Sequence, residues 1–381
     1  MVPQGNDLTS DSECVTEAVD AKVCFFGDFD PDYPREAVVR RALRRAGATV
    51  FECNCAIKHS AKGRGGGLLY VPRAYRALLL RSSQYRDRIT HFYVPHNNHT
   101  IVPLAWLLAR KNGAAVIVDA FDPAFQIALL HGRGEMEARL RSWTERVALS
   151  MADRVLVTTD EFRVLYTEMH GLNPARIRVI PPGADEMKFR ARDRLGLRDD
   201  GFSVLYWGRF HRHHGVRTII QAAELLTGHD GIRFDLVGDG LEADGARRLA
   251  SELNLGNVRF HGFTGDEELV DSIERADVCL GLLSQHVCAQ CSITNKVSEA
   301  LAMGKAVITA ESPATKRVFS HRQHAYLVQP ENPRALAEAI LELQADEQLR
   351  ERLGREGKQL YTDQLSEQAI ARLLARVLAT T

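Results

Sequence analysis

The alternation of short apolar runs with amphipathic helical stretches is the feature of this sequence that most constrains its fold. A first run, Lys22 to Phe26, ends at Gly27, Pro34 opens a helical stretch, and Ala48 to Phe51 is the next apolar run. Such a β-loop-α-β unit begins a doubly wound parallel sheet. The same alternation restarts at Phe202, so we predict an α/β protein with two Rossmann-like domains.

A change in composition marks the boundary between the two halves. Two prolines and a glycine at residues 181–183 are followed by a charged run to Asp200, which is typical of a linker between domains. A final helical stretch has Ile370 and Leu374 on one apolar face. The predicted segments are a disordered leader over residues 1–20, a first domain over 21–185, a second domain over 186–365 and a last helix over 366–381.

The composition excludes several classes of protein. At 381 residues the chain is long enough for two domains with separate cores. Its 49 Lys and Arg residues balance 49 Asp and Glu residues, so the overall charge identifies no partner. We expect no nucleic-acid partner. It has no apolar run of membrane-spanning length, and the first twenty residues lack the layout of a signal peptide. Seven scattered cysteines favour a reducing, cytoplasmic location over a disulfide framework.

A helix followed by a buried strand, Asn295 to Ile308, carries the most specific chemical signal. A helix start presents unpaired N–H groups and the positive end of the dipole, so it suits phosphate. Glu299, one turn into the helix, offers a carboxylate for a diol such as ribose, and Gly304 suits the helix end. The stretch therefore predicts a nucleotide site. The alternative is an ordinary buried αβ unit with Glu299 on a solvated face.

Polar residues follow two predicted strands of the first half. His96 and His99 come after the run 91–94, and Asp119 and Asp122 come after the run 114–118. Because ligands bind outside the carboxyl ends of parallel strands, these four side chains are placed to meet a substrate. His96, Asp119 and Asp122 are candidate catalytic groups by position. The alternative for a loop histidine is a hydrogen bond to its own surroundings.

A basic segment lies within the first half. From Arg35 to Arg88 there are thirteen Lys and Arg residues and three Asp and Glu residues. Arg73, Arg76 and Arg81 fall on a predicted helix that also carries apolar and aromatic residues. This pattern suits an anionic membrane surface or an acidic substrate, and we predict a peripheral contact with an anionic membrane. The alternative is a solvated helix face.

Six short motifs keep their order and spacing between residues 177 and 308. They are Val179 to Asp185, Gly208-Arg209 with Gly215, Val237 to Gly240, Val258 to Gly262, Ala276-Asp277 and Glu299 to Ile308. Together these motifs resemble the retaining glycosyltransferases of family four, which have the GT-B fold. Residues 21–176 fit more loosely, through the order of strands and helices and the opening Tyr33 to Arg35.

The resemblance implies two Rossmann-like, doubly wound domains that face each other across a cleft, with the last helix crossing back onto the first domain. The second domain would hold a nucleotide diphosphate sugar, a UDP- or GDP-sugar. The first would hold an acceptor that is a glycan, a lipid or a small molecule. Transfer would retain the anomeric configuration. Cations and N–H donors would stabilise the leaving diphosphate, so we expect no metal and no other cofactor.

The resemblance also implies roles for individual residues. Arg209 would hold the diphosphate bidentately, the backbone near Gly262 would meet the base, and Glu299 would hold the ribose. The donor-binding set is Gly208, Arg209, His214, Gly262, Phe263, Thr264, Cys291, Thr294, Asn295, Lys296 and Glu299. The acceptor-binding set is Gly27, Asp28, Tyr33, Arg35 and His99.

Two positions depart from the family pattern. His214 stands where the family usually has a phosphate-binding lysine, and a histidine is positive only when protonated. A bound diphosphate would raise its pKa, and Arg212 is a substitute. Cys291 stands where the family usually has a glutamate that contacts the donor sugar, and a thiol is a poor hydrogen-bond acceptor. Lys296, between Cys291 and Glu299, would add charge.

These departures keep other functions open. The first alternative is a degenerate relative that binds a nucleotide sugar or glycan without catalysis, which Cys291 favours. The second is a hexosamine epimerase on the same fold. His286, Cys288 and Cys291 also have the spacing of half a zinc site or of a redox pair. The other interpretation of that cluster is a set of small residues that line the donor pocket.

Overall fold

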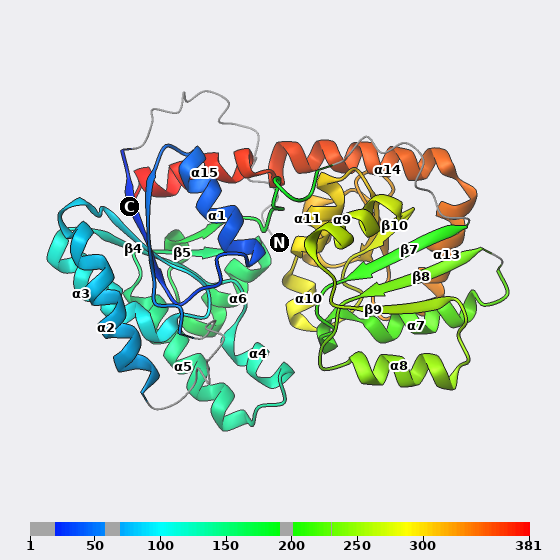
Figure 1. The fold of residues 1–381 in the computed structure, drawn as a ribbon, viewed down its shortest axis with the longest axis horizontal. Helices are drawn as coiled ribbons and strands as arrows, with labels where there is room; N and C mark the ends of the chain where they lie inside the picture. The colour runs from blue at the N-terminus through cyan, green and yellow to red at the C-terminus, as the bar shows by residue number, and fades with distance from the viewer. Residues whose placement is uncertain (1–19, 58–68, 191–200, 230) are drawn as a thin grey trace, which may run out of the picture.

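The structure, a computed structural model, describes residues 20–57, 69–190, 201–229 and 231–381. The predicted leader, apart from Asp20, lies outside the described residues, as does the end of the predicted linker at residues 191–200. The described chain forms two α/β domains side by side (Figure 1), which confirms the fold class predicted from the alternation of strands and helices.

The first domain is built on a six-stranded parallel sheet in the order β2-β1-β3-β4-β5-β6. Its strands are β1 (Lys22–Gly27), β2 (Thr49–Asn54), β3 (His91–Val94), β4 (Ala115–Asp119), β5 (Arg154–Val157) and β6 (Ile177–Val179). Its α-helices are α1 (Pro34–Arg45), α2 (Tyr70–Ser82), α3 (Val102–Asn112), α4 (Ala124–Leu130), α5 (Glu135–Met151) and α6 (Asp160–His170), with short 3₁₀ turns at Ser83–Arg88, His99–Ile101 and Pro174–Arg176.

The second domain repeats this architecture with a parallel sheet in the order β12-β11-β10-β7-β8-β9. Its strands are β7 (Phe202–Trp207), β8 (Ile232–Val237), β9 (Val258–Gly262), β10 (Val278–Leu280), β11 (Ala306–Ala310) and β12 (Tyr326–Val328). Its α-helices are α7 (Val216–Leu225), α8 (Ala243–Glu252), α9 (Asp266–Arg275), α10 (Val287–Cys291), α11 (Asn295–Ala302), α12 (Pro313–Val318), α13 (Pro333–Ala345) and α14 (Glu347–Leu360). A 3₁₀ turn at Arg212–His214 precedes α7, and a π turn at Tyr361–Leu365 follows α14.

Three helices differ from the sequence prediction. One is α10, which was not anticipated ahead of the helix predicted from Asn295; the His286 side chain accepts from the Cys288 N–H as its N-cap. The short α4 and the whole of α6 were not anticipated between the predicted strands. These helices contact the other domain or its loops. Such contacts leave no regular apolar pattern in the local sequence, so the helices could not be predicted from it.

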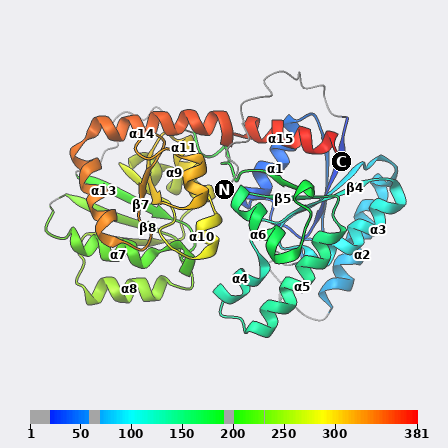
Figure 2. The ribbon, with the colours of Figure 1, turned by 180° about the vertical axis from the view of Figure 1, so that it is seen from behind.

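The last helix, α15 (Glu367–Ala379), leaves the second domain and lies on the first (Figures 1 and 2). Ile370 and Leu374 are buried in one apolar cluster with Val38 and Leu43 of α1. At the start of α15, the buried Glu367 carboxylate accepts from Arg41 of α1 at 2.6 Å. The chain therefore passes between the domains twice, once near residue 180 and again before α15.

Direct contacts also join the two domains. The Thr159 hydroxyl, at the start of α6, donates to the Cys291 carbonyl at 2.5 Å. Arg317 of α12 pairs with Glu161 of α6 at 2.8 Å. These contacts bring the carboxyl ends of both sheets face to face, because α6 and α10 each follow a strand of their own sheet.

Candidate functional site

The start of α11 forms one wall of the candidate site in the second domain. Its N-cap, Thr294, has an extended backbone and makes no side-chain cap bond. The Thr294 hydroxyl oxygen is buried without a hydrogen-bond partner among the described residues. Asn295, the first residue of the helix, is partly buried. Because the first N–H groups of a helix have no partner within it, this wall presents several unused donors to an anion.

Lys296 places a buried cation beside these donors. Only 7% of the residue is exposed, and its Nζ has no hydrogen-bond partner among the described residues. The ammonium lies 4.0 Å from the centre of the Tyr206 ring. Burial lowers the pKa of Lys296 to about 7, although the nearby Glu299 carboxylate opposes the shift. A buried ammonium without an anion is costly, so the geometry calls for an anionic ligand.

Gly208 brings the backbone of the second domain close to the same ammonium. It follows β7 with φ of 116°, a conformation that favours glycine. A Cβ atom added there would lie 3.4 Å from Lys296 Nζ. The loop after the neighbouring strand β8 also packs closely on Gly208, since a Cβ atom at Gly238 would lie 2.0 Å from the Gly208 carbonyl oxygen. The turn therefore lets an anion approach the backbone and Lys296 together.

Glu299 lies one turn further along α11. Only 5% of it is exposed, and its Oε2 accepts a hydrogen bond of 2.8 Å from Trp207 Nε1. Burial raises the pKa of Glu299 to about 7, while Trp207 and Lys296 pull it down. The indole fixes one carboxylate oxygen. This arrangement orients the carboxylate beside the Lys296 ammonium, as the sequence led us to expect for a residue that holds a diol.

Arg209 and His214 differ in their ability to supply positive charge. Arg209 is exposed, and no carboxylate of the described residues pairs with it. The His214 Nδ1 instead lies 2.8 Å from the Tyr206 hydroxyl. Burial, together with Lys296, lowers the pKa of His214 well below its ordinary value. The free protein thus has a neutral His214, and the expectation that it acts as a phosphate cation applies only to a state with an anion bound.

Further imidazoles adjoin His214 and reach the first domain. The ring of His213 lies 4.5 Å from His214 and 6.0 Å from His286. The ring of His211 lies 5.4 Å from His131, which ends α4 of the first domain. Burial and neighbouring cationic groups lower the pKa of His211 to about 4. Burial also lowers the pKa of His213, and this row of rings links the two domains beside Lys296.

The loop after β9 contains the residues expected to meet a nucleotide base. Gly262 has φ of 67°, and Phe263 after it is 69% exposed. The Thr264 hydroxyl oxygen is buried and has no partner among the described residues. An exposed ring next to an unused hydroxyl suits stacking and one polar contact with a planar ligand. The contact of this loop with a nucleotide base stays a prediction.

Cys291 meets the first domain rather than a partner in its own. Its side chain packs against the apolar core of the first domain, and its carbonyl accepts from Thr159. Burial raises the pKa of its thiol to about 11. His286 caps α10 instead of facing Cys291, and no set of three metal-ligating side chains converges anywhere in the described ranges. The zinc interpretation of the His286, Cys288 and Cys291 spacing is therefore wrong for the described geometry.

His96 and Glu36 form a buried pair at the carboxyl end of β3. The His96 Nδ1 lies 2.5 Å from Glu36 Oε1, with 16% and 3% of the two side chains exposed. Burial alone lowers the pKa of His96, but the Glu36 carboxylate outweighs it, and the pKa is raised. The ring of His96 lies 4.8 Å from the Tyr33 ring. Glu36 therefore orients His96 and keeps a proton available on it.

Asp122 lies near this pair. Burial raises its pKa to about 6, and the nearby His96 opposes the shift. Phe121, beside it, has its ring 5.6 Å from His96 and 6.5 Å from Tyr33. Arg209 of the second domain lowers the pKa of Tyr33, although burial dominates and raises it overall. His96, Asp122 and Tyr33 thus adjoin one another and approach the donor side through Arg209.

Asp119 and Arg35 bind each other and are not available to a substrate. The Arg35 Nε lies 2.9 Å from Asp119 Oδ2, and each side chain is 1% exposed. The Tyr93 hydroxyl donates to the same oxygen at 2.7 Å, and Arg35 also donates to the Ile180 and Pro181 carbonyls. These bonds fix β4 to α1 and to the end of the first domain. We correct the catalytic assignment of Asp119 and the acceptor assignment of Arg35.

Three other acceptor candidates also have structural partners. A Cβ at Gly27 would lie 3.1 Å from the Asn98 side chain, which accepts from the Asp28 N–H. The Asp28 carboxylate accepts from the Ile57 N–H. His99 Nε2 lies 3.6 Å from the buried Glu145. These contacts hold neighbouring loops together, so Gly27, Asp28 and His99 are not part of the candidate site that we describe.

Three residues of the site were missed by sequence reasoning. Trp207 holds Glu299, Tyr206 lies under Lys296, and Glu36 holds His96. Trp207 and Tyr206 end a buried strand, which is the position where parallel sheets bind ligands, so that position was an available signal. Glu36 had no such signal because its partner is sixty residues away in the sequence.

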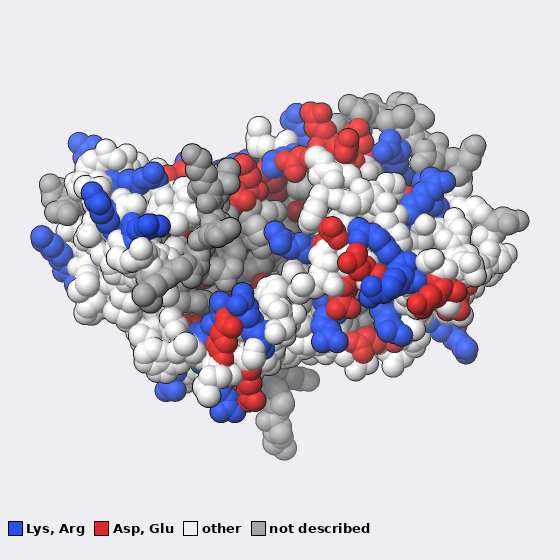
Figure 3. All heavy atoms as spheres, turned by 60° about the horizontal axis from the view of Figure 1, so that its bottom comes forward, with Lys and Arg blue, Asp and Glu red and all other residues white. Residues whose placement is uncertain are grey.

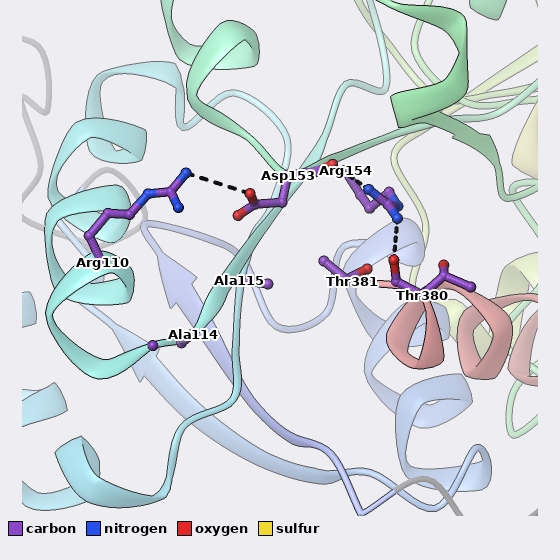
Figure 4. A pocket seen from close by; sticks show the side chains of 8 residues that line it. Arg110, Ala114, Ala115, Asp153, Arg154, Thr380 and Thr381 are labelled. Atoms are coloured by element: carbon purple, nitrogen blue, oxygen red, sulfur yellow. Dashed lines mark hydrogen bonds and ion pairs between the residues drawn. The ribbon is translucent and has the colours of Figure 1, made fainter.

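A hollow of about 270 Å³ elsewhere in the first domain does not belong to this site. Arg110, Asp153, Arg154 and the Thr380–Thr381 segment line it (Figure 4). Arg110 lies 3.7 Å from Asp153, and Arg154 donates to the Thr380 carbonyl. The hollow adjoins the amino ends of β4 and β5, at the edge of the sheet opposite the candidate site.

Solved structures of other proteins share this architecture. Sucrose-phosphate synthase from Thermosynechococcus elongatus superposes with a TM-score of 0.73 at 22% identity, over 95% of this chain and 100% of that chain. HepE from Anabaena, in complex with UDP-glucose, gives a TM-score of 0.71 at 16% identity, over 94% of this chain and 100% of that chain. At these identities the likeness establishes the fold, which is GT-B.

Curated relatives match the chain over about half of its length. A lipopolysaccharide core biosynthesis glycosyltransferase, LpsE of Rhizobium meliloti, is 29% identical over 190 residues, which are 50% of this chain and 53% of that protein. D-inositol 3-phosphate glycosyltransferase of Mycobacterium bovis is 31% identical over 196 residues, which are 48% of this chain and 40% of that protein. The chain spans about half the length of these relatives or less.

Family profiles match both domains. The profile described as glycosyl transferase 4-like domain covers residues 13–183, and the profile described as glycosyl transferases group 1 covers residues 187–360. The boundary between the two profiles falls where the chain first passes from one domain to the other. With its GT-B fold and both profiles matched in order, this chain belongs to the family-four, group 1 glycosyltransferases.

Proposed function

We propose that this protein is a glycosyltransferase that moves a sugar from a nucleotide diphosphate donor to an acceptor. The donor, a UDP- or GDP-sugar, binds the second domain, and the acceptor, a glycan, a lipid or a small molecule, binds the first. Transfer retains the anomeric configuration and uses no metal. HepE, a protein of the same fold, was solved with UDP-glucose, which favours UDP as the first nucleotide to test.

The single observation that carries this proposal is the unpaired ammonium of Lys296. It is buried, it adjoins the open start of α11 and the Gly208 turn, and its Nζ has no hydrogen-bond partner among the described residues, although the Glu299 carboxylate lies near enough to raise its pKa. A diphosphate satisfies all three groups at once, because it brings negative charge and several acceptor oxygens. Glu299 then stands one helical turn away, at the distance where a nucleotide carries its ribose.

The proposed chemistry uses these donors to stabilise the leaving group. Breaking the sugar–phosphate bond places negative charge on the diphosphate, and Lys296, Arg209 and the α11 N–H groups are directed at it. His96 and Asp122, on the opposite domain, would bind hydroxyl groups of the transferred sugar or the acceptor. The Glu36 carboxylate raises the pKa of His96 and so favours its protonated, donating form, whereas the pKa of Asp122 is about 6.

The test is a calorimetric titration with uridine, guanosine, adenosine and thymidine diphosphates. We expect one nucleotide to bind selectively and Glu299→Ala to weaken it by losing the ribose contact. Glu338→Ala is the matched control, since Glu338 is an exposed glutamate of the same domain. Absence of binding to every diphosphate, or equal loss in the control variant, would contradict the proposed donor site.

A non-catalytic relative is the second candidate, and one observation favours it. Cys291 occupies the position of the usual sugar-contacting glutamate and packs on the first domain. Product analysis with the selected nucleotide sugar separates the candidates. Release of the nucleoside diphosphate with glycosylated acceptor or free sugar supports the transferase, conversion of the donor to its epimer supports an epimerase, and an unchanged donor that nevertheless binds supports the binding protein.

We also infer a peripheral position on an anionic membrane, at its cytoplasmic face. Arg73, Arg76 and Arg81 are all exposed on α2, which carries no acidic residue. The described cysteines are free thiols, as in a reducing compartment. No helix in the described ranges has the length and apolar content to cross a bilayer. Replacing the three arginines by glutamine should reduce co-sedimentation with anionic vesicles, and equal sedimentation with neutral vesicles would contradict the inference.

A further inference from the structure

Helix α5 exposes an uninterrupted apolar ridge on its outer side. Met136, Leu140, Trp143 and Val147 are 82%, 61%, 63% and 36% exposed. Their spacing of four, three and four residues places them on one line along a helix. The buried residues of α5 lie on the opposite side of the helix and include Ala138, Glu145, Ala148 and Leu149. The side farthest from the core, where polar residues are normal, is thus the apolar one.

The apolar ridge belongs to a wider surface of the first domain. Ala74 of α2, Ala105 of α3 and Ala148 of α5 lie in one buried cluster, so the three helices cover the same face of the sheet. Figures 1 and 2 show them together at the outer and lower part of the first domain. Of the fourteen large apolar side chains that the described part of the chain exposes, nine lie from Leu69 to Val147. Exposed apolar side chains gathered in this way mark an interaction site.

Basic residues flank the apolar ridge. Arg139 and Arg146 lie on one side of it, Arg141 lies on the other, and all three are exposed. Glu135 and Glu137 pair with Arg139 and Arg141 respectively, whereas Arg146 pairs with no acidic residue of this helix in the described part of the chain. Helices α2 and α3 add basic residues and no acidic ones. At the outer end of the first domain, Figure 3 accordingly shows basic residues with no acidic residues between them.

We propose that the apolar ridge of α5 inserts into an anionic phospholipid bilayer, beside the arginines of α2, and so forms the apolar half of the membrane contact inferred above. An apolar line with a tryptophan, flanked by arginine, is the pattern of a helix that lies in the plane of a membrane interface. A second copy of the chain fits less well. A two-fold interface would press the same arginine-flanked surface against itself and bring like charges together.

The test is flotation with vesicles of phosphatidylglycerol and phosphatidylcholine in equal parts, compared with phosphatidylcholine alone. The ridge variant carries Met136→Ser, Leu140→Ser and Trp143→Ser. Its matched control carries Met187→Ser, Leu225→Ser and Leu241→Ser, which change three exposed apolar residues of the second domain. We expect wild type and control to bind the anionic vesicles alike and the ridge variant to bind at least tenfold more weakly.

Other outcomes overturn the proposal in distinguishable ways. If the ridge variant floats like wild type, the ridge does not contribute to the membrane contact, which then rests on the arginines of α2 alone. If wild type binds neither kind of vesicle, the protein makes no membrane contact of this kind. A wild-type dimer that the ridge variant converts to monomer, measured by analytical ultracentrifugation, assigns the ridge to self-association. Nucleotide titration of the ridge variant should match wild type, so failure of the membrane contact leaves the proposed transferase activity separately testable.

Discussion

At the scale of single residues, the donor site depends on a buried lysine whose ammonium has no hydrogen-bond partner among the described residues. The sequence predicted Lys296 and Arg209 at the phosphates and Glu299 at the ribose, because each belongs to a short ordered motif. Residues paired over long sequence distances were not predictable. Arg35 and Asp119 are 84 positions apart and form a hydrogen-bonded ion pair. No feature of the sequence near either residue indicates this pairing.

Replacing Lys296 by methionine should have two opposite effects. The affinity for the selected nucleoside diphosphate should fall roughly ten- to hundredfold, because charge-assisted hydrogen bonds contribute about 1.5–3 kcal/mol. The nucleotide-free protein should unfold at a higher temperature, because a costly buried ammonium is removed. Titration calorimetry and differential scanning fluorimetry measure the two effects. Lys316→Met, at an exposed lysine, should change neither; a destabilised Lys296→Met would argue against an uncompensated ammonium.

Binding of inorganic pyrophosphate should weaken as the pH rises from 6 to 8. Lys296 has a pKa of about 7 in the free protein, and that of His214 is depressed. A bound anion raises the pKa values of Lys296 and His214, so binding is accompanied by proton uptake. The affinity that this proton uptake adds is fully present at low pH and is lost as the pH rises through the pKa values of the bound state. His214→Lys should hold its affinity to higher pH, whereas His229→Lys, at an exposed site, should follow wild type. Affinity that is flat with pH would contradict this assignment.

At the scale of elements, strands and long helices were predictable and the short connecting helices were not. The predicted run 91–94 coincides with β3, and the predicted runs 22–26 and 114–118 differ from β1 and β4 by one residue at one or both ends. The agreement arises because elements that pack on a core carry apolar residues at regular spacing, and this spacing can be recognised in the sequence. The helix α10 is five residues long and is held by Thr159 of the other domain. Its sequence has too few turns for a pattern, so its conformation depends on tertiary contact.

The packing of α15 predicts how strongly this element supports the first domain. Leu374 is 1% exposed within the cluster shared with α1. Leu374→Ala should therefore lower the free energy of unfolding by about 2–5 kcal/mol, the usual range for a buried leucine. Arg372→Ala, at an exposed position of the same helix, is the control and should cost less than about 0.5 kcal/mol. Denaturant unfolding monitored by circular dichroism measures both, and equal effects would mean that α15 is only loosely docked.

At the scale of the whole molecule, the number of domains, their order and the fold class followed from the sequence. The restart of the strand–helix alternation and the ordered motifs were sufficient for these. The contacts that set one domain against the other were not predictable, since Arg317 and Glu161 are 156 positions apart. The apolar ridge of α5 was also missed. Because α5 has large apolar residues on its outer side and small residues on its inner side, its apolar pattern does not show which side faces the core.

Ligand binding should stabilise the molecule as a whole. At a free concentration one hundred times its dissociation constant, a ligand adds about 2.7 kcal/mol to the stability of the state that binds it. The selected nucleoside diphosphate should therefore raise the unfolding temperature of the transition that includes the second domain. Scanning calorimetry measures the shift. Lys296→Met should show a smaller shift at the same nucleotide concentration, and a shift that is unchanged in this variant would place the nucleotide elsewhere.

The return of α15 to the first domain has a consequence during synthesis on the ribosome. Residues 20–180 emerge first, yet the apolar cluster that α1 forms on one face of their sheet is completed by Ile370, Leu374, Val377 and Leu378 of α15. At ordinary elongation rates the nascent chain waits roughly ten to forty seconds for those residues. Until then a half-finished domain exposes part of its apolar surface, and chaperones or premature self-association compete for it. The second domain, whose segments are contiguous, has no such delay.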